Sequence, residues 1–275
     1  MLHAIYTTRS NISILAKKYS LLRTTRARML GLYNKYAGRT VFCVGNGPSL
    51  TAGQIQLASR FPFIATNRAH QLFTAESFER NGNGWIIMND NNRCLEVLPD
   101  LPTNYKNVIF STFLPDSLNE VAKLSRHDWI FSPCKWKIFF NQNGLQLAPD
   151  LQQAFSKDFS KVYYPGYSVI FPAIQLAHYM GATRIILIGC DMNYSGPTQY
   201  SDLIKLERLK IGHLGSFNYE TQGRNHMIAC RDALANFGKE ILNGTVGGAI
   251  QELKRVTHPE LIDLMARQER RDLNA

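Results

Sequence analysis

The feature that most constrains the fold is a series of short, continuous apolar segments that each end in polar residues. These segments are TVFCVG (40–45), PFIATN (62–67), GWIIMND (84–90), NVIFST (107–112), the weaker HDWIFSP (127–133) and TRIILIGCD (183–191). Continuous apolar strands are typical of a parallel sheet that is covered on both faces. The pattern predicts an α/β fold with a Rossmann-like, mostly parallel sheet and helices on both faces.

Helical spacing of apolar residues separates and follows these segments. It predicts helices within SVIFPAIQLAHYMG (168–181) and HMIACRDALANFGKE (226–240), and a terminal amphipathic helix over 257–275. The segment IQELKRV (250–256) suits either a strand or a helix. Residues 113–165 are irregular and aromatic, and we expect them to form a lid or an acceptor-binding subregion.

The overall composition is that of a globular protein with one main domain, which we place at residues 39–275. Hydrophobic residues make up 45% of the 275-residue chain, and no apolar run has the roughly 18–20 residues that span a bilayer. The N-terminus lacks the features of a secretory signal. The five cysteines lie far apart, which indicates neither a disulfide framework nor a zinc site. These observations predict a cytoplasmic protein.

The positive charge is concentrated in an N-terminal arm, residues 1–38. Residues 1–40 contain eight of the 31 Lys and Arg and no Asp or Glu, so the rest of the chain is nearly neutral. Apolar residues interleave with these charges, as in an amphipathic helix. Such an arm suits the anionic inner leaflet of a membrane, whereas no basic stripe in the body predicts nucleic-acid binding. The alternative is a solvated helix that packs on the body.

A glycine-rich turn, GNGPS (45–49), follows the first predicted strand. Gly45 and Gly47 would let backbone amides approach a phosphate, and Ser49 lies where a helix could begin. The turn lacks the third glycine of a dinucleotide fingerprint and the lysine of a P-loop. The same residues also suit a purely structural turn.

Three asparagines, Asn46, Asn67 and Asn89, each follow a predicted strand, and Gly189 and Asp191 close the strongest one. The carboxyl ends of parallel strands share one edge of the sheet, where ligands of such folds bind. An amide side chain offers both a donor and an acceptor, which suits nucleobase edges and ribose hydroxyls. The alternative is that each asparagine is an ordinary capping residue.

Candidate catalytic groups lie in the loops that follow. Tyr194 and Tyr200 could donate hydrogen bonds to a leaving phosphate without a metal. His226 begins a predicted helix, a position that lowers the pKa of an imidazole and suits a general base, and His213 competes for this role. Asp90, Asp191 and Asp202 could bind Mg²⁺, although no two of them lie close together in the sequence.

Several segments of the chain, in their order, resemble one superfamily. They are VFCVGNGPSL, FIATNRAHQLF, WIIMNDNN, the GYSVIF…LIGCDMNY stretch, NHMIACRDALANFG and ILNGTVGG. Its branches are the bacterial sialyltransferases of glycosyltransferase family 42 and the archaeal 6-hydroxymethylpterin diphosphokinase family, whose bacterial members include sugar transferases acting on flagellin or surface glycans. The resemblance covers about residues 40–248.

The sialyltransferase branch implies a CMP-sugar donor and a glycan or glycolipid acceptor, with no cofactor. The resemblance implies nucleotide contacts by Gly45, Asn46, Gly47, Ser49, Asn67, Asn89, Ser168, Gly189 and Asp191. It further implies that His226 is the base and that Tyr194 and Tyr200 hold the leaving phosphate. The family's Thr-Ser-Gly turn before the central helix is replaced here by Gly166-Tyr167-Ser168.

The diphosphokinase branch shares the first turn, the Gly-x-Asp strand end and an NGTVGG-like segment. It implies ATP as donor and Mg²⁺ held by Asp90 and Asp191. A third hypothesis is a membrane-peripheral module that binds a nucleotide sugar without turning it over.

Overall fold

The computed structural model describes residues 27–79, 83–88, 107–110, 129–131, 136–141, 144–149, 155–193, 201–204 and 218–273. Eight strands form one sheet in the order β10-β9-β8-β1-β2-β3-β4-β5, and every neighbouring pair is parallel. The strands are β1 Thr40–Val44, β2 Phe63–Thr66, β3 Gly84–Met88, β4 Val108–Phe110, β5 Trp129–Phe131, β8 Arg184–Ile188, β9 Glu240–Asn243 and β10 Lys254–Arg255. The predicted α/β fold is confirmed.

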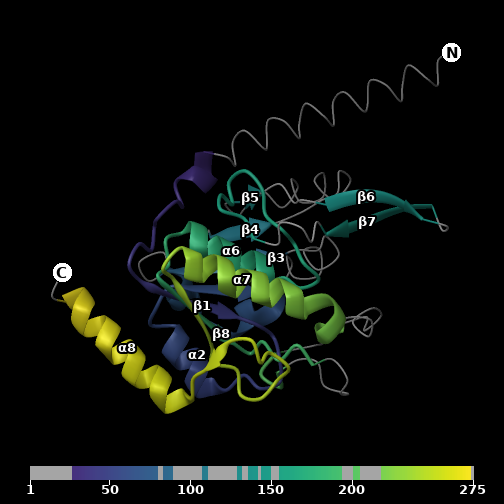
Figure 1. Cartoon of the computed structure of the whole chain (residues 1–275). Coiled ribbons are helices and arrows are strands. Elements are labelled where there is room, and N and C mark those ends of the chain that lie inside the picture. Colours follow the sequence, from purple (N-terminus) through teal and green to yellow (C-terminus); the bar gives the residue numbers. More distant parts are fainter. Residues whose placement is uncertain are drawn as a thin grey trace.

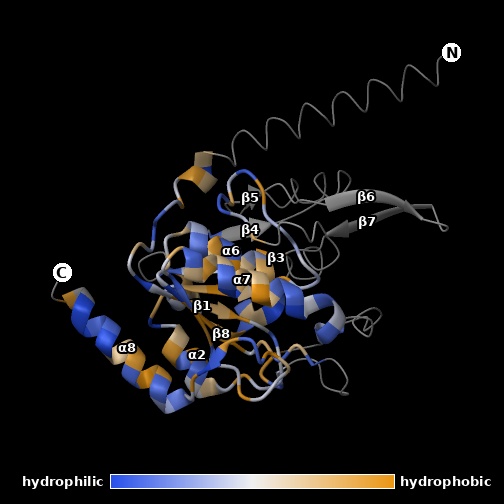
Figure 2. Ribbon diagram, in the orientation of Figure 1, coloured by the Kyte–Doolittle hydropathy of each residue, from blue (hydrophilic) through white to orange (hydrophobic). Residues whose placement is uncertain are grey.

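Alternate residues of the strands face two separate cores. In β1, Val41 and Cys43 belong to one core, while Phe42 and Val44 belong to the other. The first core includes α6 (Ile170–Tyr179) and α7 (Arg224–Asn236); the second includes α2 (Ala52–Ala58) and α8 (His258–Leu273). Figure 1 shows these helices around the sheet, and Figure 2 shows the apolar strands enclosed between them.

Shorter elements complete the described structure. They are the 3₁₀ helix η1 (Asn67–Leu72), α3 (Ala75–Glu79), the π-helical turn η6 (Tyr219–Gly223), and the antiparallel hairpin of β6 (Trp136–Asn141) and β7 (Gly144–Pro149). Strand β5 lies in the segment 127–133, where a weaker strand was predicted, whereas β6 and β7 form a hairpin within residues that were expected to be irregular. Short aromatic and β-branched runs such as IFF in β6 form strands once neighbouring backbone is available to pair with.

The C-terminal part of the N-terminal arm packs into the main core. Met29, Leu32 and Tyr36 are buried with the first core, and the Trp85 Nε1–H donates to the Tyr36 hydroxyl at 2.7 Å. Residues 31–38 form turns rather than the expected continuous helix. These residues are therefore part of the body, whereas residues 1–26 lie outside the described structure. Among the described helices, none combines the length and the apolar composition needed to cross a membrane.

Candidate functional site

The strand order of the sheet reverses between β1 and β8. Strands β1 to β5 follow one another to one side, and β8 returns to pair with the other side of β1. In open α/β sheets such a reversal leaves a crevice beyond the carboxyl ends of the two strands, where ligands bind. The GNGPS turn after β1 and the Gly189–Asp191 segment after β8 lie at this position.

We call Gly45, Gly47 and Ser49 with Gly189 and Asp191 the glycine turn. Its backbone amides are used within the protein, because Gly45 N–H donates to Ile188 O and Gly47 N–H to Gly189 O, both at 2.8 Å. The Ser49 hydroxyl donates to Asp191 Oδ2 at 2.9 Å. For Gly45 and Gly47, these hydrogen bonds are those of a structural turn, the alternative that the sequence left open.

Close approach explains the two glycines. A Cβ on Gly45 would lie 2.1 Å from Gly189 O, and a Cβ on Gly47 would lie 1.8 Å from Asp191 Oδ2. No side chain fits at either distance. Burial raises the pKa of Asp191 and outweighs the opposing effect of the Ser49 hydrogen bonds. The glycine turn is thus a packed joint between two central strands.

Asn46 lies in the middle of this turn and points to β2. Its Nδ2–H₂ donates to Thr66 O at 2.9 Å and to Thr66 Oγ1 at 3.1 Å. Because Thr66 O accepts only, these bonds fix which amide atom is nitrogen. Asn46 Oδ1 is buried and has no hydrogen-bond partner among the described residues.

Asn67 follows β2 directly and has a left-handed backbone, with φ of 47°. Its Oδ1 is likewise buried and has no partner within the described part of the chain. A non-glycine residue in this backbone region is uncommon, and asparagine is enriched among those that adopt it. Asn46 and Asn67 therefore bring unused acceptors to neighbouring strand ends.

His226 is in the first turn of α7 and is 1% exposed. Its ring centroid is 5.2 Å from that of Phe171 and 6.1 Å from that of Tyr167, at the start of α6. Neither ring nitrogen has a hydrogen-bond partner in the described structure, and burial lowers the pKa of the imidazole. Since helices between parallel strands begin at the carboxyl edge, His226 lies at the same edge as the asparagines. We call Asn46, Asn67 and His226 the unsatisfied trio.

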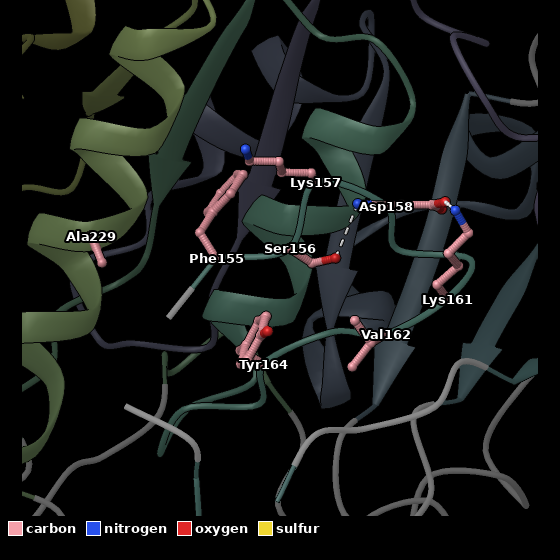
Figure 3. Close-up of a pocket in the computed structure, with 8 residues that line it drawn as sticks. All are labelled: Phe155, Ser156, Lys157, Asp158, Lys161, Val162, Tyr164 and Ala229. Carbon is pink, nitrogen blue, oxygen red and sulfur yellow. Dashed lines mark hydrogen bonds and ion pairs between the residues drawn. The ribbon is translucent and has the colours of Figure 1, made fainter. Parts of the chain in front are cut away.

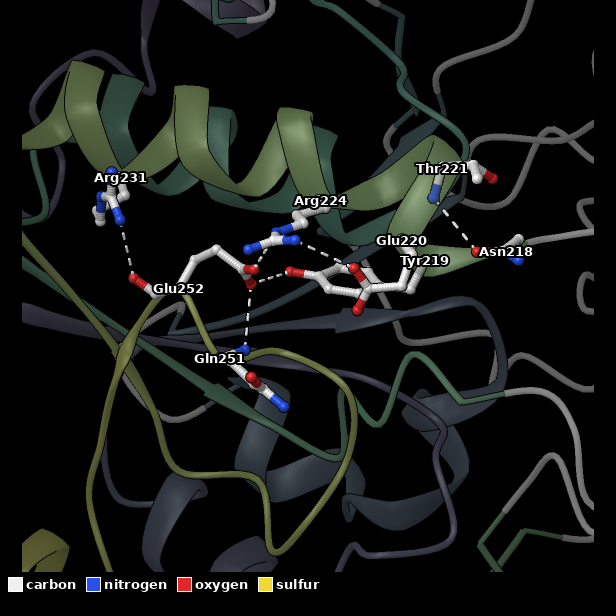
Figure 4. Close-up of polar contacts among 8 residues, drawn as sticks. All are labelled: Asn218, Tyr219, Glu220, Thr221, Arg224, Arg231, Gln251 and Glu252. Atoms are coloured by element: carbon white, nitrogen blue, oxygen red, sulfur yellow. Dashed lines mark hydrogen bonds and ion pairs between the residues drawn. The ribbon is translucent and has the colours of Figure 1, made fainter.

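The turn before His226 is held by a buried carboxylate. Glu252 accepts from the Tyr219 hydroxyl at 2.5 Å and from Arg224 Nε at 2.8 Å, as Figure 4 shows. Burial alone would raise the pKa of Glu252, but these partners and the amides of Glu252 and Gln251 lower it. The contact joins the loop after β9 to η6, and π-helical turns often occur at functional sites.

The other predicted site residues are placed as follows. Ser168 precedes α6, and its carbonyl accepts from Phe171 N–H at 3.1 Å. Gly189 has a left-handed backbone, with φ of 61°. The remaining candidates, Asn89, Asp90, Tyr194, Tyr200 and His213, lie outside the described residues.

Sequence reasoning missed several residues that shape this edge. Thr66 holds Asn46, and the Thr245 hydroxyl accepts from Cys190 N–H at 3.1 Å. Arg255 donates to the carbonyls of Thr245, Gly247, Gly248 and Ile250, and so shapes the loop after β9. The NGTVGG segment was a sequence signal for this loop, but Glu252 and Arg255 carried none.

Comparison with known proteins gives little. No protein-family model matches the chain, and no curated protein matches its sequence. Among solved structures, the chain is similar to the MAf glycosyltransferase from Magnetospirillum magneticum AMB-1, with a TM-score of 0.45 and 14% sequence identity. The match covers 90% of this chain and 41% of that chain, so this chain spans less than half the length of that protein. A similarity at this level assigns neither a family nor an activity.

Proposed function

We propose that this chain is an inverting glycosyltransferase that takes a sialic-acid-type sugar from a CMP-activated donor to a surface glycan or glycolipid. The observation that carries the proposal is the unsatisfied trio. A buried polar atom without a partner costs about 1–3 kcal/mol, and these three residues have none among the described residues, so a ligand at this edge would remove that cost. The position is the crevice in which folds of this class bind nucleotides.

The two amide oxygens suit the nucleoside. Asn46 Oδ1 and Asn67 Oδ1 are acceptors, and a cytosine amino group or ribose hydroxyls would supply the missing donors. Gly45, Gly47, Ser49, Gly189 and Asp191 would support this contact as scaffold. Asn89 and Ser168 complete the proposed nucleotide site.

His226 suits the role of general base. Burial keeps its ring neutral near pH 7, so a nitrogen is free to accept a proton. The acceptor oxygen would bond to the anomeric carbon as the bond from that carbon to the CMP phosphate oxygen breaks on the opposite face. The acceptor's proton would pass to His226, and the electron pair would leave with CMP.

Tyr194 and Tyr200 would stabilise the departing phosphate by hydrogen bonding, and the route needs no metal. Ser201, the residue after Tyr200, donates its N–H to Asn46 O at 2.8 Å. This contact brings the described segment that follows Tyr200 to the glycine turn. The part of the basic arm before residue 27 would dock the enzyme on the anionic inner leaflet from the cytoplasmic side.

The test is thermal unfolding with CMP, CDP, UDP, GDP or ATP, each with and without Mg²⁺. We expect CMP to stabilise the protein without metal, by about 2.7 kcal/mol at one hundred times its Kd. A preference for ATP with Mg²⁺ would instead favour the pterin diphosphokinase, with Asp90 and Asp191 as metal ligands. If the protein binds CMP but transfers no sugar to any glycan acceptor, the result would favour the third hypothesis, a nucleotide-sugar binding module without catalytic activity.

The base is tested by His226→Ala. We expect turnover to fall about 10²- to 10⁴-fold while CMP affinity stays within a few-fold. Replacement of His178, a second buried histidine on α6, is the matched control and should leave turnover intact. Full turnover by His226→Ala would exclude the proposed mechanism.

A further inference from the structure

A cavity of about 650 Å³ lies between the segment 155–164 and α7 (Figure 3). This volume is within the range of small-molecule binding sites, roughly 300–1,000 Å³. No residue of the unsatisfied trio lines it. The lining residues are Phe155, Ser156, Lys157, Asp158, Lys161, Val162, Tyr164 and Ala229.

The wall of the cavity is fixed before any ligand arrives. Gln175 of α6 is fully buried and its Oε1 accepts from Ser156 N–H at 3.1 Å and Tyr164 N–H at 3.0 Å. Its Nε2–H₂ donates to Tyr164 O at 2.8 Å. One side chain thus holds the segment at both ends, and preformed walls lower the entropy lost on binding.

The lining divides into an apolar wall and a cationic rim. Phe155, Val162, Tyr164 and Ala229 supply aromatic and aliphatic surface, while the exposed Lys157 and Lys161 supply charge. Asp158 pairs with Lys161 at 3.1 Å, but such an exposed pair contributes at most about 1 kcal/mol and yields easily to a ligand. Lys157 forms no ion pair with a described residue.

We propose that this cavity binds an anionic amphiphile. Its apolar body would pack against Phe155, Val162 and Tyr164, and its phosphate, sulfonate or carboxylate group would pair with Lys157 or Lys161 at the rim. The proposal does not depend on the glycosyltransferase function. A soluble metabolite and a membrane lipid share this chemistry, so the test includes both.

The cavity also adjoins the elements that hold His226. Ala229 lies three residues after His226, on the same side of α7 and roughly 4.5 Å along its axis. The segment 155–164 leads directly to Tyr167, whose ring is 6.1 Å from that of His226. An occupant would therefore contact both elements that flank the histidine.

The probe is 8-anilinonaphthalene-1-sulfonate, an aromatic sulfonate whose fluorescence rises in apolar sites. The full chain should bind it saturably with one high-affinity site. Lys157→Gln with Lys161→Gln should weaken binding about tenfold, and Ala229→Trp, which fills the cavity, should abolish it. Lys254→Gln, which removes an exposed lysine on β10, is the matched control and should bind as the parent does.

Two further measurements decide the outcome. Equal urea midpoints across the variants ensure that the dye reports the cavity rather than partial unfolding. Displacement by monomeric octyl phosphate would identify a soluble ligand, and displacement by phosphatidylglycerol vesicles alone would identify a lipid. Binding that is unaffected in both lysine and Ala229 variants, or that CMP displaces, would overturn the proposal.

Discussion

Two groups of residues share the carboxyl edge of the sheet and differ in how their polar atoms are used. In the glycine turn, the amides of Gly45 and Gly47 and the hydroxyl of Ser49 all donate to partners in the segment after β8 or at its end. In the unsatisfied trio, buried oxygens and nitrogens have no partner among the described residues. The polar atoms of the first group are satisfied within the described fold, whereas those of the second have no partner there, and we propose that a ligand supplies it.

The difference teaches that a glycine-rich turn is not by itself evidence for a phosphate site. Here the glycines are required because a Cβ on Gly45 would lie 2.1 Å from Gly189 O and a Cβ on Gly47 would lie 1.8 Å from Asp191 Oδ2. We propose that the better signal is the asparagine between them, whose nitrogen donates to Thr66 and whose oxygen has no partner among the described residues.

The largest loss of stability among the variants that test this comparison is expected at Gly45. A Cβ there would meet the backbone oxygen of Gly189 at 2.1 Å, so Gly45→Ala should lower the free energy of unfolding by about 3 kcal/mol or more. Urea denaturation measures this loss. Gly238→Ala is the control: its φ is 66° but no atom lies within 4 Å of the added Cβ, and we expect a loss of about 1 kcal/mol. Equal losses would show that close approach is not the reason for Gly45.

His178, a buried histidine away from the carboxyl edge, provides a comparison with His226. His178 is buried beside Phe155 and Phe237, and burial, followed by the charge of Lys239, lowers its pKa to about 4. The unfolded histidine binds a proton near pH 6.5, so stability is complete above that pH and falls as the pH drops toward 4. The wild-type protein should lose free energy of unfolding between pH 7 and pH 4.5, and His178→Phe should reduce that loss by about 2–3 kcal/mol, as measured by urea unfolding.

His226 keeps part of the pH dependence in that variant, because burial lowers its pKa as well. The two histidines should differ in their response to ligand. We expect CMP to shift the imidazole NMR signal of His226 and to leave that of His178 in place. A pH dependence unchanged by His178→Phe would contradict the assignment.

Substitution of Glu252 tests whether the loop after β9 stabilises the turn before His226. Its side chain is 6% exposed and contacts both Tyr219 and Arg224, so Glu252→Gln should lower stability by about 2 kcal/mol and speed amide exchange in η6. Glu220→Gln removes a carboxylate that is 62% exposed and pairs with the same Arg224, and it should change stability by less than about 0.5 kcal/mol. Similar losses in both variants would assign the effect to Arg224 alone.

The smallest effect on stability is expected at Asn67. Asn67→Gly relieves a left-handed backbone and removes an unpaired oxygen, so stability should change by less than about 0.5 kcal/mol while CMP affinity falls about tenfold. Asn34→Gly is the matched control, because Asn34 has φ of 56° and lies away from the sheet edge. Calorimetric titration distinguishes them. Undiminished CMP affinity in Asn67→Gly would remove Asn67 from the site.

The main strands were predictable because each is a continuous apolar run that must be buried on both faces. The runs at 40–45 and 183–191 contain the observed β1 and β8. The pairing of β6 with β7 was not predictable, because hairpin partners depend on register rather than on either run alone. The burial of Tyr36 was also missed, since its partner Trp85 lies 49 residues away.

The location of these polar residues at the carboxyl edge was predictable, but their hydrogen bonds were not. Polar residues at strand ends indicated the carboxyl edge, and Asn46, Asn67 and His226 were all named from the sequence. The direction of the Asn46 amide was not, because it depends on Thr66, a residue that sequence patterns treat as part of a strand. The bond of Ser49 to Asp191 joins residues 142 positions apart, beyond any local pattern.

The pairing of β1 with β8 has a consequence for how the protein is made. The register joins Thr40 to Arg184, so the glycine turn closes only after most of the chain has left the ribosome. Until then one edge of β1 has no neighbour, and contacts of such long sequence separation form slowly. An unpaired apolar edge is also where a nascent chain aggregates. We therefore expect the yield of folded protein to depend on synthesis rate and chaperones more than its final stability suggests.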